Sequence, residues 1–197
     1  IKSGSDISII SNRHRNNLIS WLKHSNPFSL DIYSPNDEFI TPIACSEYSP
    51  ELQSQIMQLN LSDLSGPILD IGCGKKAELV AFLRKSGLNA FGIDRFENIS
   101  PFIQNENWLE FDYGTDLWGT IISNLGFSNH FLHHHLRKDG KYIDYAQTYM
   151  KILNSLKVGG KFYYSPALPF IEVYLDRRSF DVRSSDVEDS GFRATII

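Results

Sequence analysis

One stretch of the sequence, residues 67–83, constrains the fold more than any other: PILDIGCGKKAELVAFL. Its apolar run ends in Asp70, passes through Gly72 and Gly74, and then continues directly into an amphipathic helical pattern. This order predicts a buried strand, a tight turn and a helix. Glycines in the turn permit backbone angles and a close ligand approach that a Cβ atom would prevent. A turn that needs glycine only for its conformation explains the same residues, so both interpretations stand at this point.

From residue 66 onward, short apolar runs alternate with segments of helical period. We predict helices at 77–86 and over 142–160, the second ending in a glycine pair, and strands at 68–71, 90–93, 108–111, 120–124 and 161–166. A closing antiparallel hairpin is predicted from 180–182 and 192–197, across the acidic turn SSDVEDSG. Strands separated by helices imply right-handed crossovers and a sheet covered on both faces. The fold class is therefore α/β, with a doubly wound, mostly parallel sheet.

The first part of the chain lacks this alternation. It offers one amphipathic helix at 13–24, followed by a passage rich in proline, serine and asparagine. We therefore divide the chain into an N-terminal arm or lid at 1–48 and a single α/β domain at 49–197. A helix is predicted to begin after Ser49, because Ser49 can cap it, Pro50 suits the first position and Glu51 complements the positive end.

A second apolar run, NAFGIDRF, ends in another acid, Asp94, 22 positions after Gly72. An acid about 20 residues beyond a glycine turn is where the ribose hydroxyls of a nucleotide-like ligand are held. The turn and the acid together therefore predict an adenosine-containing ligand. A dinucleotide is disfavoured, because a pyrophosphate needs the full G-x-G-x-x-G pattern, and Gly74 is instead followed by Lys-Lys-Ala.

Four segments, LDIGCG, GIDRF, IISNLGF and ILNSLKVGGKFYYS, resemble in order and spacing the motifs of class I S-adenosylmethionine-dependent methyltransferases. The resemblance covers about residues 50–197 and implies the Rossmann-like methyltransferase fold with S-adenosylmethionine as cofactor. It implies that the glycine turn contacts the methionine part of the cofactor, while acids after the second and third strands bind ribose and adenine. The cofactor-binding residues it implies are Asp70, Gly72, Cys73, Gly74, Asp94, Arg95, Asp112, Tyr113, Ser123 and Asn124.

The resemblance also implies the reaction. An O, N, S or C atom of the acceptor attacks the sulfonium methyl in line, and the protein supplies positioning and removal of water. The motifs fix no catalytic residue, so the catalytic residues are unknown at this stage. The chain departs from the family at Lys76, where a third glycine is common, and at Trp118-Gly119, where Phe-Asp is common. Methylation of nucleic acid bases is disfavoured, because the segment SNLGF replaces the Asn/Asp-Pro-Pro-Tyr/Phe tetrapeptide of enzymes that methylate them.

The histidine-rich segment SNHFLHHHLRK has three open interpretations. His130 and His134 stand four residues apart and share one face of a helix, as metal ligands or a general base do. No carboxylate or cysteine lies at ligand spacing, so we favour solvated or capping histidines over a substrate-side base, and no metal is predicted. The aromatic residues that follow can belong to the core, or at least one can face the substrate: Tyr163, Tyr164, Phe170 and Tyr174.

Composition restricts the partners. A chain of 197 residues with 42% hydrophobic residues suits one domain with a core of ordinary size. Its formal charge of −4 gives no overall attraction for nucleic acid or anionic lipid. Cys45 and Cys73 are too few for a disulfide framework, and no stretch is long enough to span a membrane, so a cytoplasmic location is expected.

Two functions remain. The first is a methyltransferase acting on a small molecule, with the N-terminal arm closing over the acceptor through Trp21, Phe28 and Tyr33. The second is a non-catalytic interaction or regulatory module that has the same fold and binds the same cofactor. Only turnover separates them, and neither the acceptor nor the oligomeric state is predicted.

Overall fold

The computed structural model describes residues 13, 16–17, 48–187 and 193–197. Of the helix predicted at 13–24, only residues 13, 16 and 17 are described, and these three are helical. The other residues of the predicted arm, including Trp21, Phe28 and Tyr33, lie outside the described residues, and the division of the chain after residue 48 stays a prediction. No helix in the described part of the chain has the length and apolar character needed to cross a membrane.

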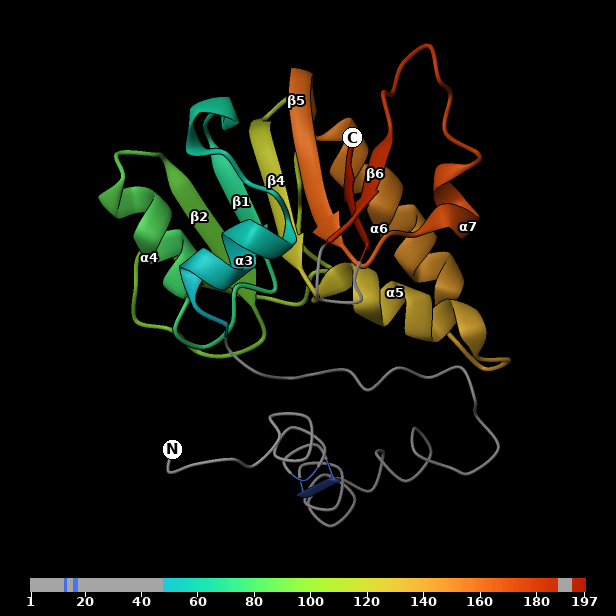
Figure 1. Cartoon of the computed structure of the whole chain (residues 1–197), viewed down its shortest axis with the longest axis horizontal. Helices are drawn as coiled ribbons and strands as arrows, with labels where there is room; N and C mark the ends of the chain where they lie inside the picture. Colours follow the sequence, from blue (N-terminus) through green and yellow to red (C-terminus); the bar gives the residue numbers. More distant parts are fainter. Residues whose placement is uncertain (1–12, 14–15, 18–47, 188–192) are drawn as a thin grey trace, which may run out of the picture. The chain divides into compact units, whose positions relative to one another are not determined.

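A seven-stranded sheet organises the described residues (Figure 1). Its strands are β1 (Ile68–Ile71), β2 (Ala90–Asp94), β3 (Ile103–Asn105), β4 (Trp118–Asn124), β5 (Leu156–Ser165), β6 (Arg183–Asp186) and β7 (Arg193–Ile196). They lie in the order β3-β2-β1-β4-β5-β7-β6. Strands β1 to β5 are parallel, whereas β7 is antiparallel to both β5 and β6. This confirms the predicted doubly wound, mostly parallel sheet with an antiparallel C-terminal hairpin.

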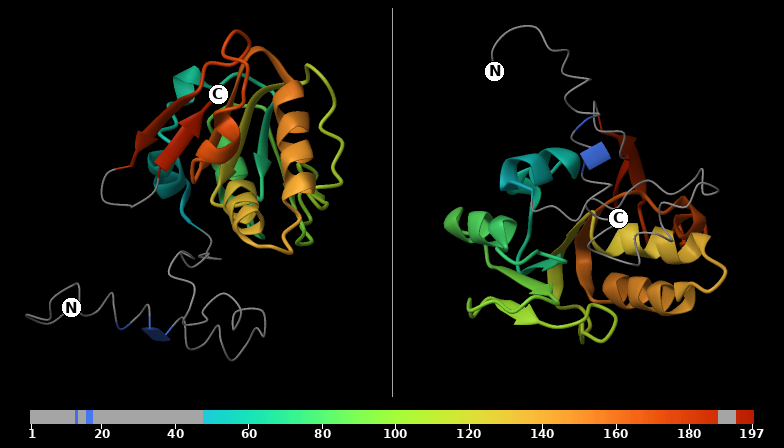
Figure 2. Two further views of the ribbon diagram at one scale, coloured as in Figure 1. Left: turned by 90° about the vertical axis from the view of Figure 1, so that its right-hand side faces the viewer. Right: turned by 90° about the horizontal axis from the view of Figure 1, so that it is seen from below.

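Helices cover both faces of the sheet. They are α3 (Pro50–Ile56), the short 3-10 helix η1 (Leu61–Asp63), α4 (Glu78–Lys85), α5 (Phe127–Leu136), α6 (Tyr142–Asn154) and α7 (Pro169–Glu172). Figure 2 shows α3 and α4 on one side of the sheet and α5 and α6 on the other. Strand β1 contributes to both cores: Leu69 and Ile71 join the core on the α5 and α6 side, and Ile68 joins the core on the α3 and α4 side. All four residues of β1 are buried, as expected for a central parallel strand.

Helix α3 begins where predicted, and both predicted limits of α4 are close to the observed ones. In α3, the Ser49 hydroxyl accepts a hydrogen bond from the Leu52 amide at 3.3 Å, with proline at the first position and Glu51 in the first turn. Helix α4 lies within one residue of the predicted limits at each end, and Gly87 follows it with a φ of 84°. Local signals therefore mark the start of α3, through the Ser49 cap, and the end of α4, through Gly87.

The strand predicted at 108–111 is wrong. The third strand is β3, earlier in the chain, where Ile103 pairs with Gly92 of β2. Residues 108–110 form a turn instead, because the Asn107 side chain accepts from the Leu109 amide at 3.1 Å and the Asn107 carbonyl accepts from the Glu110 amide at 2.9 Å. An asparagine that bonds the following backbone favours a turn over a sheet ladder.

Two boundaries near the C-terminus also differ from the prediction. Helix α6 ends at Asn154, and the glycine pair lies inside β5, where Gly159 adopts a φ of 76°. The hairpin begins later than expected, because pairing starts at Arg183 opposite Ile196 and residues 184–186 of the predicted turn belong to β6. Phe180 instead packs against the core on the α5 and α6 side.

Candidate functional site

The glycine turn leaves β1 at the carboxyl edge of the sheet, where open α/β sheets bind ligands. Gly72 and Gly74 have φ values of 77° and 76°, in the left-handed region that other residues rarely adopt. The amides of Gly72 and Cys73 both donate to the carbonyl of Ile93, at 2.9 and 3.2 Å, which fastens the turn to the end of β2. A Cβ atom at Gly72 would lie 3.2 Å from the ring of Trp108, so the glycine is also required for space.

Asp94 and the glycine turn are in direct contact. The Asp94 side chain is 6% exposed, and its Oδ2 accepts from the Gly74 amide at 2.8 Å while its Oδ1 accepts from the Phe96 amide at 3.3 Å. Each oxygen of an ionised carboxylate can accept more than one hydrogen bond. The carboxylate is therefore held rigidly by backbone donors and can still bind further hydroxyl groups.

Asp70 is the least satisfied acid of the site. Its side chain is 1% exposed, and Oδ2 has no hydrogen-bond partner among the described residues. Burial, with the nearby Asp94 adding to it, raises the pKa of the Asp70 carboxyl to about 7. A buried oxygen without a donor is costly, so this carboxyl favours a cationic or N–H-bearing ligand beside it.

Asn124 supplies a second unsatisfied oxygen at the end of β4, the strand next to β1. Its Oδ1 is buried without a hydrogen-bond partner in the described part of the chain. The following residue, Leu125, has a φ of 54°, an unusual conformation for a leucine that is typical of functional turns. The Ser123 hydroxyl accepts from the Phe127 amide and donates to the Ile71 carbonyl, both at 3.1 Å, so it fixes the ends of β4 and β1 together.

The side chain of Cys73 has a packing role. Burial raises the pKa of its thiol well above the ordinary value. A Cβ atom on Gly92 of β2 would lie only 2.8 Å from the Cys73 sulfur, so the thiol fills the space that this glycine leaves. A thiol that stays protonated is a poor nucleophile, so only the backbone of Cys73 is suited to contact a ligand.

Three of the predicted site residues lie outside the glycine turn. Arg95 is exposed next to Asp94, and Asp112 is exposed with its Oδ1 accepting from the Gly114 amide at 3.0 Å. Tyr113 is buried and donates from its hydroxyl to the Trp108 carbonyl at 2.8 Å. Burial raises the pKa of Tyr113, so it stays a neutral donor that shapes the loop around Trp108.

Trp108 and His130 belong to this site although the sequence did not single out Trp108. The Trp108 ring lies against Gly72, and His130 of α5 packs edge-on against Trp108, with 5.2 Å between ring centroids. Burial, with the nearby Arg95 adding to it, lowers the pKa of His130 to about 4, so His130 is neutral at ordinary pH. No sequence signal links these two residues, because the loop that carries Trp108 meets α5 only in the folded chain.

The other histidines of α5 have structural contacts. His134 accepts from the Lys141 amide at 3.2 Å through Nδ1, and its ring stacks on Tyr145 with centroids 4.9 Å apart. His135 stacks on Phe170 with ring centroids 3.8 Å apart. Within the described residues, no group of three or more histidine, cysteine, aspartate or glutamate side chains is placed to hold a metal ion.

A buried acid that sequence reasoning missed lies beyond the end of β5. Glu172 is 6% exposed, and its Oε1 accepts from the Leu168 amide and the Tyr164 hydroxyl, both at 2.6 Å, and from the Thr195 hydroxyl at 3.0 Å. The Tyr164 hydroxyl also meets that of Tyr149 at 3.0 Å. This network is enclosed in the core, so of the four aromatic residues considered above Tyr164 is structural, whereas Tyr174 is 85% exposed.

Comparison with known proteins returns structures but no sequence relatives. No known protein family matches the sequence, and no curated protein matches it. One matching structure is 1,6-didemethyltoxoflavin-N1-methyltransferase from Burkholderia thailandensis with bound 1,6-didemethyltoxoflavin and S-adenosylhomocysteine. It is 16% identical in sequence, the match covers 94% of this chain and 87% of that chain, and the TM-score is 0.49. The N-methyltransferase NodS from Bradyrhizobium japonicum is 13% identical, with 74% and 92% covered and a TM-score of 0.45.

Another matching structure is a possible exported protein from Bordetella parapertussis, 13% identical with a TM-score of 0.46. The match covers 74% of this chain and 66% of the Bordetella chain, slightly less than two thirds of the latter. At these identities and TM-scores, the function of the chain has to be inferred from its own residues.

Proposed function

We propose that the chain is an S-adenosylmethionine-dependent methyltransferase with a small-molecule acceptor. The observation that carries this proposal is a pair of buried oxygens, Asp70 Oδ2 and Asn124 Oδ1, at the ends of the adjacent strands β1 and β4. Neither has a hydrogen-bond partner among the described residues. A ligand with positive charge and N–H donors satisfies such acceptors. S-adenosylmethionine carries both an ammonium group and a positively charged sulfur, so its amino acid end fits these two residues.

The rest of the cofactor fits the same edge of the sheet. The backbone from Gly72 to Gly74 offers a surface without Cβ atoms for the methionine part, and Asp94 has acceptor capacity left for ribose hydroxyls. Ser123 and Tyr113 hold the surrounding turns in place, and Arg95 lies at the exposed rim.

The adenine end is proposed to lie in a cavity of about 670 Å³ beside β2. This cavity extends along β2 from Asn89, just before the strand, to Ile93 near its carboxyl end. Phe102 and Phe111 provide flat apolar surface, and Glu106 and Asp112 add carboxylates. A volume of this size is typical of small-molecule sites. Asp112 therefore remains the proposed partner of the adenine amino group. Glu106, which follows β3 directly, is a second acid in the same wall.

The cofactor, when bound, supplies an activated methyl group on a positively charged sulfur. The residues of the chain bind and orient it: Asp70 places negative charge near the sulfonium and ammonium groups, and the Gly72 corner lets the ligand approach the backbone closely. Trp108 and neutral His130 present apolar ring surface beside this corner and exclude water from it. An acceptor O, N or S atom held in line with the methyl group needs no covalent step on the protein.

Binding and turnover are tested with the full chain and with two matched variants. S-adenosylhomocysteine should bind the unmodified protein in calorimetry, and Asp94→Ala should weaken this binding by about tenfold or more, because hydrogen bonds from hydroxyls to a carboxylate are lost. Glu97→Ala removes an exposed acid three residues away and should leave binding unchanged. Labelled methyl transfer into a small-molecule extract, lost in Asp94→Ala, would establish the enzyme.

The alternative results are equally clear. Tight binding of the cofactor with no labelled product from any extract would favour the non-catalytic module. Absence of binding by folded protein, or equal losses in Asp94→Ala and Glu97→Ala, would overturn the cofactor proposal itself.

A further inference from the structure

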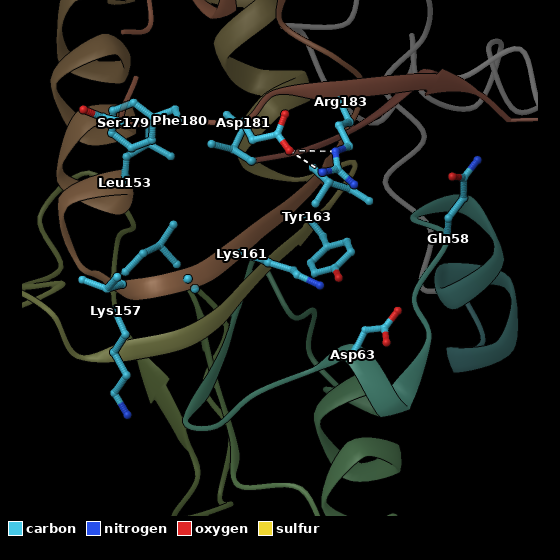
Figure 3. Close-up of a pocket in the computed structure, with 16 residues that line it drawn as sticks. Gln58, Asp63, Leu153, Lys157, Lys161, Tyr163, Ser179, Phe180, Asp181 and Arg183 are labelled. Carbon is cyan, nitrogen blue, oxygen red and sulfur yellow. Dashed lines mark hydrogen bonds and ion pairs between the residues drawn. The ribbon is translucent and has the colours of Figure 1, made fainter. Parts of the chain in front are cut away.

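A second cavity, of about 590 Å³, lies away from the glycine turn (Figure 3). Its walls are the first half of β5, the end of β7, the residues leading into β6, and the segment between α3 and β1. The proposed cofactor site lies instead at the carboxyl ends of β1, β2 and β4. The two sites therefore share no residue, and a ligand in this cavity would be bound independently of the cofactor.

Two donors from β5 point into this cavity. Lys161 and Tyr163 are two residues apart on the strand, so their side chains lie on the same face. Figure 3 shows both directed toward the space between β5 and Asp63 of η1. Tyr163 is only 3% exposed, and neither its hydroxyl nor the Lys161 ammonium has a hydrogen-bond or ion-pair partner in the described part of the chain. The Tyr163 ring is buried, but its hydroxyl reaches the cavity, so both donors are available to a ligand there.

The other charged residues of the cavity are already engaged or turned away. Arg183 forms an ion pair with Asp181, drawn as dashed lines in Figure 3. Lys157 points out of the cavity and donates to the Gly66 carbonyl at 3.3 Å. One cation, Lys161, and one anion, Asp63, therefore face the ligand space, and they form no ion pair with each other among the described residues.

This charge arrangement selects among ligands. An anion alone would meet Asp63, and a cation alone would meet Lys161, so each is opposed by a like charge. The cavity also has apolar walls, formed by Leu153, Phe180 and Ile197 from the α5 and α6 side of the sheet and by Ile196 from the side that carries Tyr163. Gln58, at the rim, holds a φ of 52°, and its Oε1 accepts from the Ser185 hydroxyl at 3.0 Å, which leaves its amide N–H₂ free to donate to a ligand.

We propose that this cavity binds an α-amino acid with a large apolar side chain. The carboxylate would accept hydrogen bonds from Lys161 and the Tyr163 hydroxyl, the ammonium group would face Asp63, and the side chain would contact the apolar walls. This site is separate from the proposed methyltransferase function and does not depend on it.

Three probes with the same apolar body test the charge requirement: L-phenylalanine, 3-phenylpropanoate, which lacks the ammonium group, and 2-phenylethylamine, which lacks the carboxylate. Ligand-observed NMR titrations use the full chain without cofactor. Phenylalanine should bind about tenfold or more tightly than either analogue, because each analogue loses a charge-assisted interaction and retains a like-charge contact. Equal affinities for the three probes, or no saturable binding of phenylalanine, would overturn the proposal.

Single-residue variants test which side chain binds the carboxylate and which binds the ammonium group of the ligand. Lys161→Met should weaken phenylalanine about tenfold or more without weakening 2-phenylethylamine, whereas Asp63→Asn should remove the preference for phenylalanine over 3-phenylpropanoate. Tyr163→Phe should weaken phenylalanine without changing the fold, since the ring is kept. Lys157→Met is the matched control for Lys161→Met and should change nothing. Equal effects of the two lysine variants would refute the assignment.

Circular dichroism and thermal unfolding of each variant separate a lost site from a lost fold. S-adenosylhomocysteine, added at saturation, should leave the affinity for phenylalanine unchanged. Displacement of phenylalanine by this compound would mean that the cavity belongs to the cofactor site, and the proposal of a second site would be wrong. The amino acid titrations are done without cofactor, so they test the second site even if the cofactor does not bind. The two proposals can therefore fail independently.

Discussion

Replacing Asp70 by asparagine should change how the stability of the protein depends on pH. The Asp70 side chain is 1% exposed, and burial followed by the charge of Asp94 raises the pKa of its carboxyl from the ordinary 3.8 to about 7. This difference corresponds to about 4 kcal/mol between the two protonation states, as an order of magnitude. Ionised Asp70 therefore destabilises the folded protein in the absence of a ligand.

The direction of the effect follows from proton binding. Between about pH 4 and pH 7 the folded state keeps a proton on Asp70 that the unfolded chain has released. The free energy of unfolding consequently falls as the pH rises through this window, by about 1.4 kcal/mol per pH unit, and the contribution is fully lost above about pH 7. An asparagine cannot ionise, so Asp70→Asn removes this dependence.

The assay is urea unfolding at pH 5 and pH 8, followed by circular dichroism. The free energy of unfolding of Asp70→Asn relative to the unmodified protein should rise by about 3 kcal/mol from pH 5 to pH 8. Any constant cost of burying the asparagine amide cancels in this comparison. Asp112→Asn is the control, because Asp112 is exposed and an asparagine can still accept from the Gly114 amide. A difference that is the same at both pH values would refute the interpretation of Asp70 as a strained acid.

Three further predictions follow from single contacts. Gly72→Ala and Gly87→Ala both place a Cβ on a left-handed backbone, but only Gly72 has a close neighbour, the Trp108 ring at 3.2 Å. In urea unfolding, Gly87→Ala should lower the free energy of unfolding by about 1 kcal/mol and Gly72→Ala by more. Only Gly72→Ala should also lose binding of S-adenosylhomocysteine. Tyr149→Phe removes the hydroxyl that meets Tyr164 at 3.0 Å and should cost about 1 kcal/mol in the same assay while leaving the affinity for S-adenosylhomocysteine unchanged. Burial lowers the pKa of His130 to about 4, and its ring packs against Trp108. Tryptophan fluorescence should therefore show a transition near pH 4 that His130→Asn removes. A His130-dependent transition at about pH 6.5 would contradict the buried environment.

The central part of the fold could be predicted because its signals are local. Residues 67–87 carry a strand pattern, two glycines and a helix with its C-terminal glycine, and β1, the turn and α4 lie where that pattern places them. The sequence pattern assigned Asp94 and the glycine turn to one ligand, but it did not predict the hydrogen bond from the Gly74 amide to Asp94.

The misplaced elements share a different cause. Residues 108–111 read as a strand because WLEF is apolar and aromatic, but the Asn107 side chain turns the backbone before a strand can form. The glycine pair resembles a helix end, yet α6 has already ended at Asn154, and a Cβ at Gly160 would approach the carbonyls of Lys157 and Trp118 to about 3 Å. In both cases the deciding contact is one that hydrophobic periodicity does not describe.

The least predictable part of the site is the state of its polar groups. The sequence places Asp70 and Asn124 at strand ends, but only packing determines that Oδ2 of one and Oδ1 of the other lie buried without donors in the described part of the chain. Each such oxygen costs about 1–3 kcal/mol in the free protein. A ligand that donates to both recovers this free energy on binding, so its affinity includes relief of strain already present in the empty site. A ligand that neutralises the Asp70 charge should therefore stabilise the protein more at pH 8 than at pH 5, because only at the higher pH does the folded state hold the ionised carboxyl.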